Sequence, residues 1–193
     1  MRSTDGWYFI LKRMLEILFS VLLLFLLALP MCVIALAIVL DSRGGAIFRQ
    51  RRVGRDGREF VCYKFRTMYM FAPNSCPKSR LGDAHRYVTP VGRFLRRTSL
   101  DELPQLFNVL VGDMSLVGPR PLVSEEGEIH VLRQRCGVYR LRPGITGLSQ
   151  INGRDDIGDI EKVRLDARYA RNVSLASDAR IIFGTLRHAA TGR

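Results

Sequence analysis

The stretch ILFSVLLLFLLALPMCVIALAIVL, from Ile17 to Leu40, contains no charged residue and sets the arrangement of the rest of the chain. As one straight helix its 24 residues would be about 36 Å long, which exceeds the thickness of a bilayer's hydrocarbon core, about 30 Å. Pro30 lies in the middle of the stretch, and proline lacks a backbone N–H and clashes with the carbonyl four residues earlier. The sequence therefore predicts a membrane helix that is broken at Pro30.

Basic residues flank this stretch on both sides, with Lys12 and Arg13 before it and several arginines between residues 43 and 58 after it. Positively charged flanks favour the cytoplasmic side of a membrane, so both ends are expected on the same side. A re-entrant helix, bent at Pro30, meets this condition because it enters and leaves through one leaflet. Two alternatives stay open: a bitopic span with a proline kink, and a signal peptide cleaved near residues 35–37.

The charge of the chain predicts an anionic partner. The net charge is +12, and residues 42–100 contain 14 basic and 3 acidic residues. Only four of the 30 basic residues are lysines, and the guanidinium group of the others binds two phosphate oxygens at once. No aromatic stacking platform or nucleic-acid reading motif accompanies this charge, so no nucleic-acid partner is expected. A membrane-anchored, basic nucleic-acid-binding protein is kept as the non-enzymatic alternative.

The residues after the apolar stretch predict a small α/β domain, of α+β type and rich in helices. Residues 46–68 are expected to form two short strands around the Asp56–Gly57 turn. Residues 70–84 are rich in proline, glycine and polar side chains, which predicts a loop. The remaining periodic segments predict helices over residues 103–110, 125–135 and 156–171, and a short amphipathic segment over residues 178–187.

Two adjacent carboxylates, Asp101 and Glu102, follow two arginines in the stretch RRTSLDELPQL, residues 96–106. Pro104 is typical of a first helical turn, so the pair lies at a helix start. One interpretation is structural, because Ser99 and Glu102 have the spacing of a capping box, and Asp101 could itself cap the helix with Pro104 in the first turn. The other is chemical, because adjacent helical side chains point in different directions, which lets one carboxylate face a substrate while its neighbour binds a metal. A phosphate would also be favoured at this helix start.

Further candidates for phosphate or nucleotide binding lie outside this stretch. Arg120 is held between two prolines, which presents its guanidinium rigidly. Lys64 and Arg66 alternate along an expected strand and would share one face. A glycine-rich turn is expected at residues 142–147. It is followed by amide and guanidinium donors at Gln150, Asn152 and Arg154.

Three of these blocks, taken together with the apolar stretch, resemble the bacterial sugar transferase family, the small monotopic polyprenyl-phosphate phosphoglycosyl transferases. The blocks are KFRTM (64–68), TPVGRFLRRTSLDELPQLFNVLVGDMSLVGPRPL (89–122) and RPGITGLSQINGR (142–154). The resemblance implies an interfacial segment and re-entrant helix over residues 1–41. It also implies a cytoplasmic, membrane-associated catalytic domain over residues 42–193. The family often has Ser-Pro at the helix break, where this chain has Leu29-Pro30.

The resemblance also implies a reaction and roles for the candidate residues. Asp101 would be the nucleophile, and Glu102 its acidic partner that holds Mg²⁺. The reaction would transfer a phosphosugar from a UDP-sugar to polyprenyl (undecaprenyl) phosphate and release UMP through a covalent Asp-phosphosugar intermediate. A membrane-bound glycosyltransferase that releases UDP is the alternative. The implied substrate-binding residues are Lys64, Arg66, Arg96, Arg120, Gln150, Asn152 and Arg154.

The same resemblance implies a place in the cell. The chain is expected at the bacterial inner membrane, with its catalytic domain on the cytoplasmic face and anionic lipids as partners. The sugar, the glycan pathway and the oligomeric state do not follow from these motifs.

Overall fold

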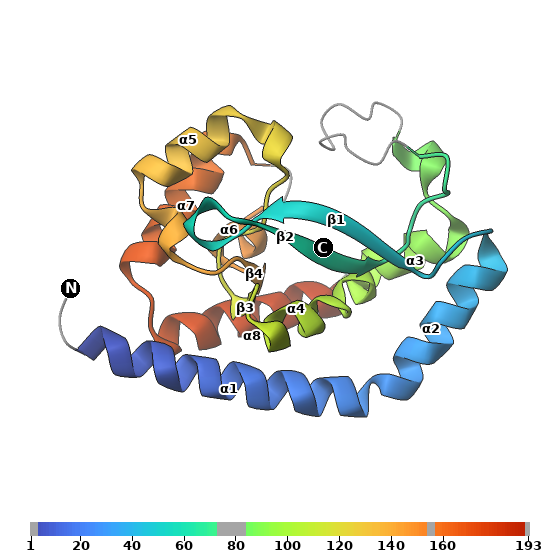
Figure 1. The fold of residues 1–193 in the computed structure, drawn as a ribbon, viewed down its shortest axis with the longest axis horizontal. Helices are drawn as coiled ribbons and strands as arrows, with labels where there is room; N and C mark the ends of the chain where they lie inside the picture. The colour runs from blue at the N-terminus through green and yellow to red at the C-terminus, as the bar shows by residue number, and fades with distance from the viewer. Residues whose placement is uncertain (1–3, 73–83, 154–156, 192–193) are drawn as a thin grey trace.

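A computed structural model describes residues 4–72, 84–153 and 157–191 (Figure 1). Within these ranges the chain forms a helix-rich α/β fold, which confirms the predicted class. The helices are α1 (Thr4–Leu26), α2 (Ala28–Asp41), α3 (Pro90–Thr98), α4 (Gln105–Val111), α5 (Glu128–Arg135), α6 (Leu148–Ile151), α7 (Asp159–Arg171) and α8 (Leu175–Thr191). The strands are β1 (Ile47–Val53), β2 (Glu59–Phe65), β3 (Ser115–Val117) and β4 (Gly144–Thr146).

The apolar stretch is divided between α1 and α2, which bend by 61° relative to one another. The interruption lies at Leu27, not at Pro30 as predicted, and Pro30 occupies the first turn of α2. The ring of Pro30 would clash with the carbonyl of Leu26, four residues earlier, if the helix continued without a break. In the first turn of a new helix the missing N–H of proline costs nothing, because N–H groups there have no partner within the helix. In the part of the chain that the structure describes, neither helix alone is long and apolar enough to cross a bilayer, and the bent pair meets the criteria of length and composition only when its two helices are taken together.

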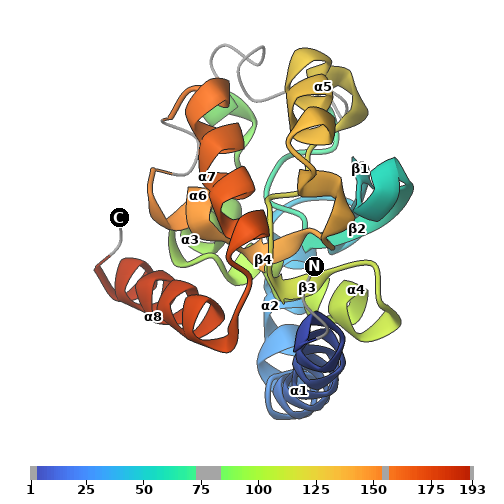
Figure 2. The same ribbon diagram turned by 90° about the vertical axis from the view of Figure 1, so that its left-hand side faces the viewer.

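One face of α1 is polar and lies against the rest of the domain. Lys12 and Glu16 are four residues apart, so they share this face. The Lys12 ammonium donates hydrogen bonds to Asp178 in α8, at 2.7 Å, and to the Tyr169 hydroxyl in α7, at 3.0 Å. The Glu16 carboxylate accepts a hydrogen bond from the Ser115 hydroxyl at the start of β3. As a result α1 lies along the domain, and Figure 2 shows α4 and α8 on opposite sides of it.

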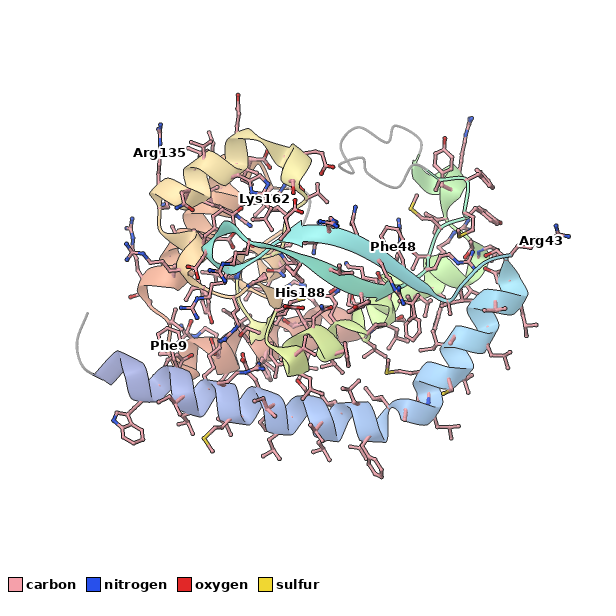
Figure 3. All side chains as sticks on the ribbon, viewed as in Figure 1. Phe9, Arg43, Phe48, Arg135, Lys162 and His188 are labelled. Atoms are coloured by element: carbon pink, nitrogen blue, oxygen red, sulfur yellow. The ribbon has the colours of Figure 1, made fainter. Side chains whose placement is uncertain are left out.

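The outer surface of α1 and α2 is apolar. Side chains project from α1 on the side away from the domain (Figure 3). A large, continuous apolar surface of this kind marks a region that contacts a membrane or another protein. Its most exposed members are Trp7, Met14, Leu18, Phe25, Leu26, Leu29, Leu36 and Leu40.

The second helix, α2, packs against α3. Ile38 of α2 forms a buried cluster with Phe65 of β2 and Leu95 of α3. Helix α3 was not among the predicted elements, although Thr89-Pro90 is a common helix start. The Thr89 hydroxyl accepts a hydrogen bond from the N–H of Gly92, at 2.9 Å, and so caps α3.

The predicted hairpin is confirmed: β1 and β2 pair antiparallel. Arg52 lies opposite Phe60, and Phe48 lies opposite Lys64, so alternation places Arg52, Cys62 and Lys64 on one face of the hairpin.

The glycine-rich segment at residues 142–147 contains a strand, which corrects the predicted turn. Within it, β4 pairs in parallel with β3. A Cβ atom on Gly144 would lie 2.1 Å from the backbone nitrogen of Gly118, so glycine is required for this close approach. The Gly144 N–H donates to the Pro119 carbonyl at 2.9 Å, which holds the turn after β3 against β4.

The other predicted elements differ mainly at their ends. The helix expected over residues 125–135 is interrupted at Gly127, whose φ of 30° is outside the helical range. The expected loop over residues 70–84 lies mostly outside the described residues. The segment expected over residues 178–187 belongs to the longer helix α8.

Candidate functional site

A small pocket is formed by the hairpin, the connection between α3 and α4, the turn after β3, and the β4–α6 segment. The pocket contains three cationic side chains and one carboxylate, a composition that suits an anionic ligand. It brings together four of the predicted residues, which are Lys64, Glu102, Arg120 and Gln150. The other lining residues were not among the predicted site residues; they are Arg52, Cys62, Gln105, Pro121, Gly144 and Ile145.

The two predicted catalytic carboxylates lie in a single 3₁₀ turn, Leu100–Glu102, between α3 and α4. The residue before this turn, Ser99, has a φ of 58° and ends α3 in the left-handed conformation. A capping residue needs an extended backbone, and the Ser99 side chain makes no cap hydrogen bond to the turn. The capping-box interpretation of Ser99 and Glu102 is therefore wrong.

Glu102 forms an ion pair with Lys64 across the pocket. The Lys64 ammonium donates to the Glu102 carboxylate at 2.6 Å, and both side chains are 22% exposed. A buried asparagine, Asn108, holds the two elements together, because it accepts from the N–H of Tyr63 at 3.0 Å and donates to the carbonyl of Val61 at 2.7 Å. These two bonds attach α4 to the strand that carries Lys64.

Asp101 is in an environment that favours its neutral form. Burial raises the pKa of Asp101 above its usual range, and the adjacent Glu102 charge adds to the increase. The positive charges of Lys64 and Arg96 oppose it. Arg96 is held close by, because its Nε donates to the Thr67 hydroxyl at 2.8 Å.

A buried ion pair supports two sides of the pocket. Arg133 and Asp166, in α5 and α7, are 2% and 1% exposed and pair at 2.5 Å. Arg133 also donates to the carbonyl of Arg120, at 2.7 Å, whereas Asp166 accepts from the Ser149 hydroxyl, at 2.8 Å. The Arg133–Asp166 pair therefore positions Arg120 on one side of the pocket. On the other side it positions the start of α6, where Ser149 precedes the pocket residue Gln150.

Sequence reasoning missed this ion pair, but a signal for it was present. Arg133 lies four residues after Ile129, and Asp166 lies three residues after Val163. Each charge is thus on the helix face that also carries a buried apolar residue. A charge at such a position indicates a buried polar contact.

Five predicted site residues are not in the lining of this pocket: Asp101 and Arg96, which lie beside it in the chain segment of Glu102, and Arg66, Asn152 and Arg154. The Arg66 guanidinium is buried at the end of α2, where it donates to the carbonyls of Ser42, at 2.8 Å, and Gly45, at 2.7 Å. Its contacts are therefore with the connection between α2 and β1. Asn152 is exposed and donates to the Leu148 carbonyl at 2.7 Å. Arg154 lies outside the described residues.

A metal ion would need ligands from the substrate as well as from the protein. Among the described residues, no group of three or more His, Cys, Asp and Glu side chains is arranged to hold a metal. The adjacent carboxylates of Asp101 and Glu102 still match the preference of Mg²⁺, which commonly takes one or two carboxylates together with phosphate oxygens and water.

Comparison with known proteins provides the context for this pocket. The family model described as "Bacterial sugar transferase" matches residues 7–192. The chain is 44% identical over 186 residues to the UDP-glucose:undecaprenyl-phosphate glucose-1-phosphate transferase of Escherichia coli strain K12. It is 41% identical over 190 residues to the undecaprenyl-phosphate galactose phosphotransferase of Salmonella typhimurium.

These matches cover 92% and 91% of the chain, but only 39% of each relative's length. A shorter relative, the exopolysaccharide production protein ExoY of Sinorhizobium fredii, is 40% identical over 191 residues, which cover 91% of the chain and 83% of that protein. The family model extends over nearly the whole chain, including both helices of the bent pair and every residue of the pocket. The chain therefore belongs to the bacterial sugar transferase family.

Proposed function

We propose that this chain transfers a phosphosugar from a UDP-sugar to polyprenyl phosphate and releases UMP. The observation that carries the proposal is the pocket, which combines Glu102 with three cationic side chains, together with the adjacent carboxylate of Asp101, which the charges of Lys64, Glu102 and Arg96 influence. Two relatives have names that include undecaprenyl phosphate and a sugar phosphotransfer, and one of these names also includes UDP-glucose.

In the proposed reaction Asp101 acts as the nucleophile. Its carboxylate oxygen attacks the sugar-proximal phosphorus, and the bond from that phosphorus to the bridging oxygen breaks, so UMP leaves with the electron pair. The acyl phosphate that forms carries the sugar. A phosphate oxygen of the lipid then attacks the same phosphorus, and the Asp101 carboxylate is released. Lys64 and Arg120 would stabilise the charge that develops on the phosphoryl oxygens.

We also propose that Mg²⁺ takes part, with Glu102 as the residue that holds it. When bound, the ion neutralises the negative charge of the donor's phosphates, which would otherwise repel an anionic nucleophile. In the structure, the Lys64 ammonium donates a hydrogen bond to the Glu102 carboxylate at 2.6 Å. Lys64 would supply its positive charge to the donor's phosphates from beside this carboxylate.

The arrangement of α1 and α2 supports a re-entrant membrane segment over residues 1–41 and a catalytic domain over residues 42–193. α1 contacts the domain through Lys12, whereas α2 contacts it through Ile38. Both ends of the bent pair thus lie on the same side as the domain, which argues against a bitopic span. The arginines that follow α2 favour the cytoplasmic face of the inner membrane and its anionic lipids.

The proposal is tested by supplying the purified chain with undecaprenyl phosphate, Mg²⁺ and one UDP-sugar at a time. We expect UMP and a lipid-linked diphosphosugar with at least one sugar, and no UDP. Release of UDP would support the alternative glycosyltransferase instead. With donor alone, intact-mass measurement is expected to show one sugar-phosphate added to the protein. A glucose and a galactose donor are the first to test, since the relatives' names include both sugars.

A further inference from the structure

Arg52 and Gln105 line the pocket but have no role in the reaction proposed above. Arg52 lies on the same hairpin face as Lys64 and lines the pocket together with Arg120. Its guanidinium donates to the carbonyl of Pro121, at 3.0 Å, which keeps it beside that arginine. Burial lowers the pKa of Arg52, and the Arg120 charge lowers it further. Two like charges held together in a partly buried site are typical of a site that binds an anion.

The second residue, Gln105, is 2% exposed and lines the same pocket. Its Nε2 atom is buried and has no hydrogen-bond partner among the described residues. Buried polar groups in native proteins are nearly always hydrogen-bonded, so an unpaired donor in a pocket wall indicates a ligand that supplies an acceptor. The charge of Glu102 in that wall is balanced by Lys64, which leaves the lining with an excess of positive charge.

We propose that Arg52 and Gln105 form a phosphate-binding subsite, in which both donate hydrogen bonds to the non-bridging oxygens of one phosphate group. A phosphate supplies only acceptors and carries negative charge, which matches an unpaired N–H donor beside two guanidinium groups. The assignment rests on the proposed function for the source of that phosphate, which is either the nucleotide donor or the lipid acceptor.

The chain contains a matched control for Arg52. Arg51 precedes it on the same strand but points to the opposite face of the hairpin, where its side chain is 79% exposed. The two arginines carry the same charge, and only Arg52 lines the pocket. Gln105 can be substituted without a matched control residue. Its Nε2 makes no contact within the described chain that a variant would lose, so Gln105→Leu, which keeps the volume, removes the donor without removing a structural hydrogen bond.

The first test measures the affinity of the full chain, in nanodiscs, for inorganic pyrophosphate by isothermal titration calorimetry. Arg52→Gln and Gln105→Leu are each expected to weaken binding by about tenfold or more, as expected for loss of a charge-assisted hydrogen bond. Arg51→Gln is expected to change the affinity less than about twofold, as a screened surface charge does. If Gln105→Leu and Arg51→Gln bind as tightly as the unmodified chain, the subsite is wrong. Gln105→Leu gives this answer even if Arg52→Gln fails to fold.

A second test identifies the source of the phosphate by steady-state kinetics of Gln105→Leu. A raised KM for the UDP-sugar alone assigns the subsite to the nucleotide donor, whereas a raised KM for undecaprenyl phosphate alone assigns it to the lipid. Unchanged KM values for both substrates would overturn the subsite and leave the proposed function intact. Pyrophosphate binding that depends on Gln105, with no UMP from any UDP-sugar, would support the subsite and refute the proposed function.

Discussion

The ammonium of Lys12 lies 2.7 Å from the carboxylate of Asp178, although the two residues are 166 positions apart in the sequence. The contact joins the first helix of the chain to its last. Both side chains are about one-tenth exposed, so it is largely shielded from water. The N-terminal half of the apolar helix is thereby attached to the domain through a polar contact, whereas its outer face remains apolar.

Loss of the Lys12 ammonium should destabilise the fold. Lys12→Met would leave Asp178 buried without its cation, which typically costs about 3–5 kcal/mol of unfolding free energy. Chemical denaturation in detergent, followed by circular dichroism, would measure it. The control is Lys162→Met, because Lys162 pairs with a mostly exposed Asp159 at 3.0 Å and such a pair contributes about 1 kcal/mol or less. Equal losses of unfolding free energy in the two variants would show that the Lys12 contact contributes no more to stability than an exposed ion pair.

The same contact predicts the topology of the chain in cells. Since α1 begins beside α8, tags at the N- and C-termini should both be protected from a membrane-impermeant protease added to spheroplasts. Both tags should be cleaved once the cells are lysed. Cleavage of the N-terminal tag in intact spheroplasts would indicate a bitopic span instead.

Removal of each predicted catalytic carboxylate should have a different effect. Asp101→Asn lacks the nucleophile and should abolish UMP release, together with the sugar-phosphate mass increase. Glu102→Gln should retain the nucleophile but lower the rate and weaken the dependence on Mg²⁺. Asp159→Asn, which changes an exposed carboxylate on α7, should leave turnover near normal. Near-normal UMP release by Asp101→Asn would exclude it as the nucleophile.

The raised pKa of Asp101 predicts the acid side of the pH profile. Only the ionised carboxylate attacks phosphorus, and a raised pKa keeps the group protonated to a higher pH. Activity should therefore fall on acidification at a pH above the ordinary value for aspartate, about 3.9. Lys64 opposes the increase, so Lys64→Met should move this limb to higher pH, while Lys64→Arg should not. The pH dependence of kcat/KM measures both effects, and an unmoved limb in Lys64→Met would contradict the assignment.

The attachment of α4 to β2 should depend on Asn108. Asn108→Leu would remove the hydrogen bonds to the N–H of Tyr63 and the carbonyl of Val61; since both bonds are only partly buried, we expect a cost of about 1–3 kcal/mol for the two together. Urea unfolding of the purified protein would show the loss. Asn172→Leu, at the exposed end of α7, is the control and should change stability by about 0.5 kcal/mol or less. A small effect of Asn108→Leu would mean that other contacts hold the helix.

The carboxylate pair and the hairpin were predictable because their signals are local. Asp101 and Glu102 are adjacent in the chain, and the Asp56–Gly57 turn lies between two segments that pair with each other along their whole length. Lys64 and Arg66 show the limit of prediction from local signals. Strand alternation placed both on one face, but β2 ends at Phe65, and the Arg66 side chain instead binds the end of α2. The alternation of side chains along a strand does not predict where the side chain of the residue after the strand points.

The sequence by itself determined that an uncharged helix is interrupted near Pro30, because an apolar run and a missing N–H act within one or two turns of backbone. It also determined that two carboxylates follow two arginines. Only the tertiary structure decided which cations meet those carboxylates, how α1 lies on the domain, and where Arg52 and Gln105 point. These outcomes depend on buried contacts such as Lys12 with Asp178 and Arg133 with Asp166. Such contacts form only when segments that are far apart in the sequence pack against each other and shield the charges from water.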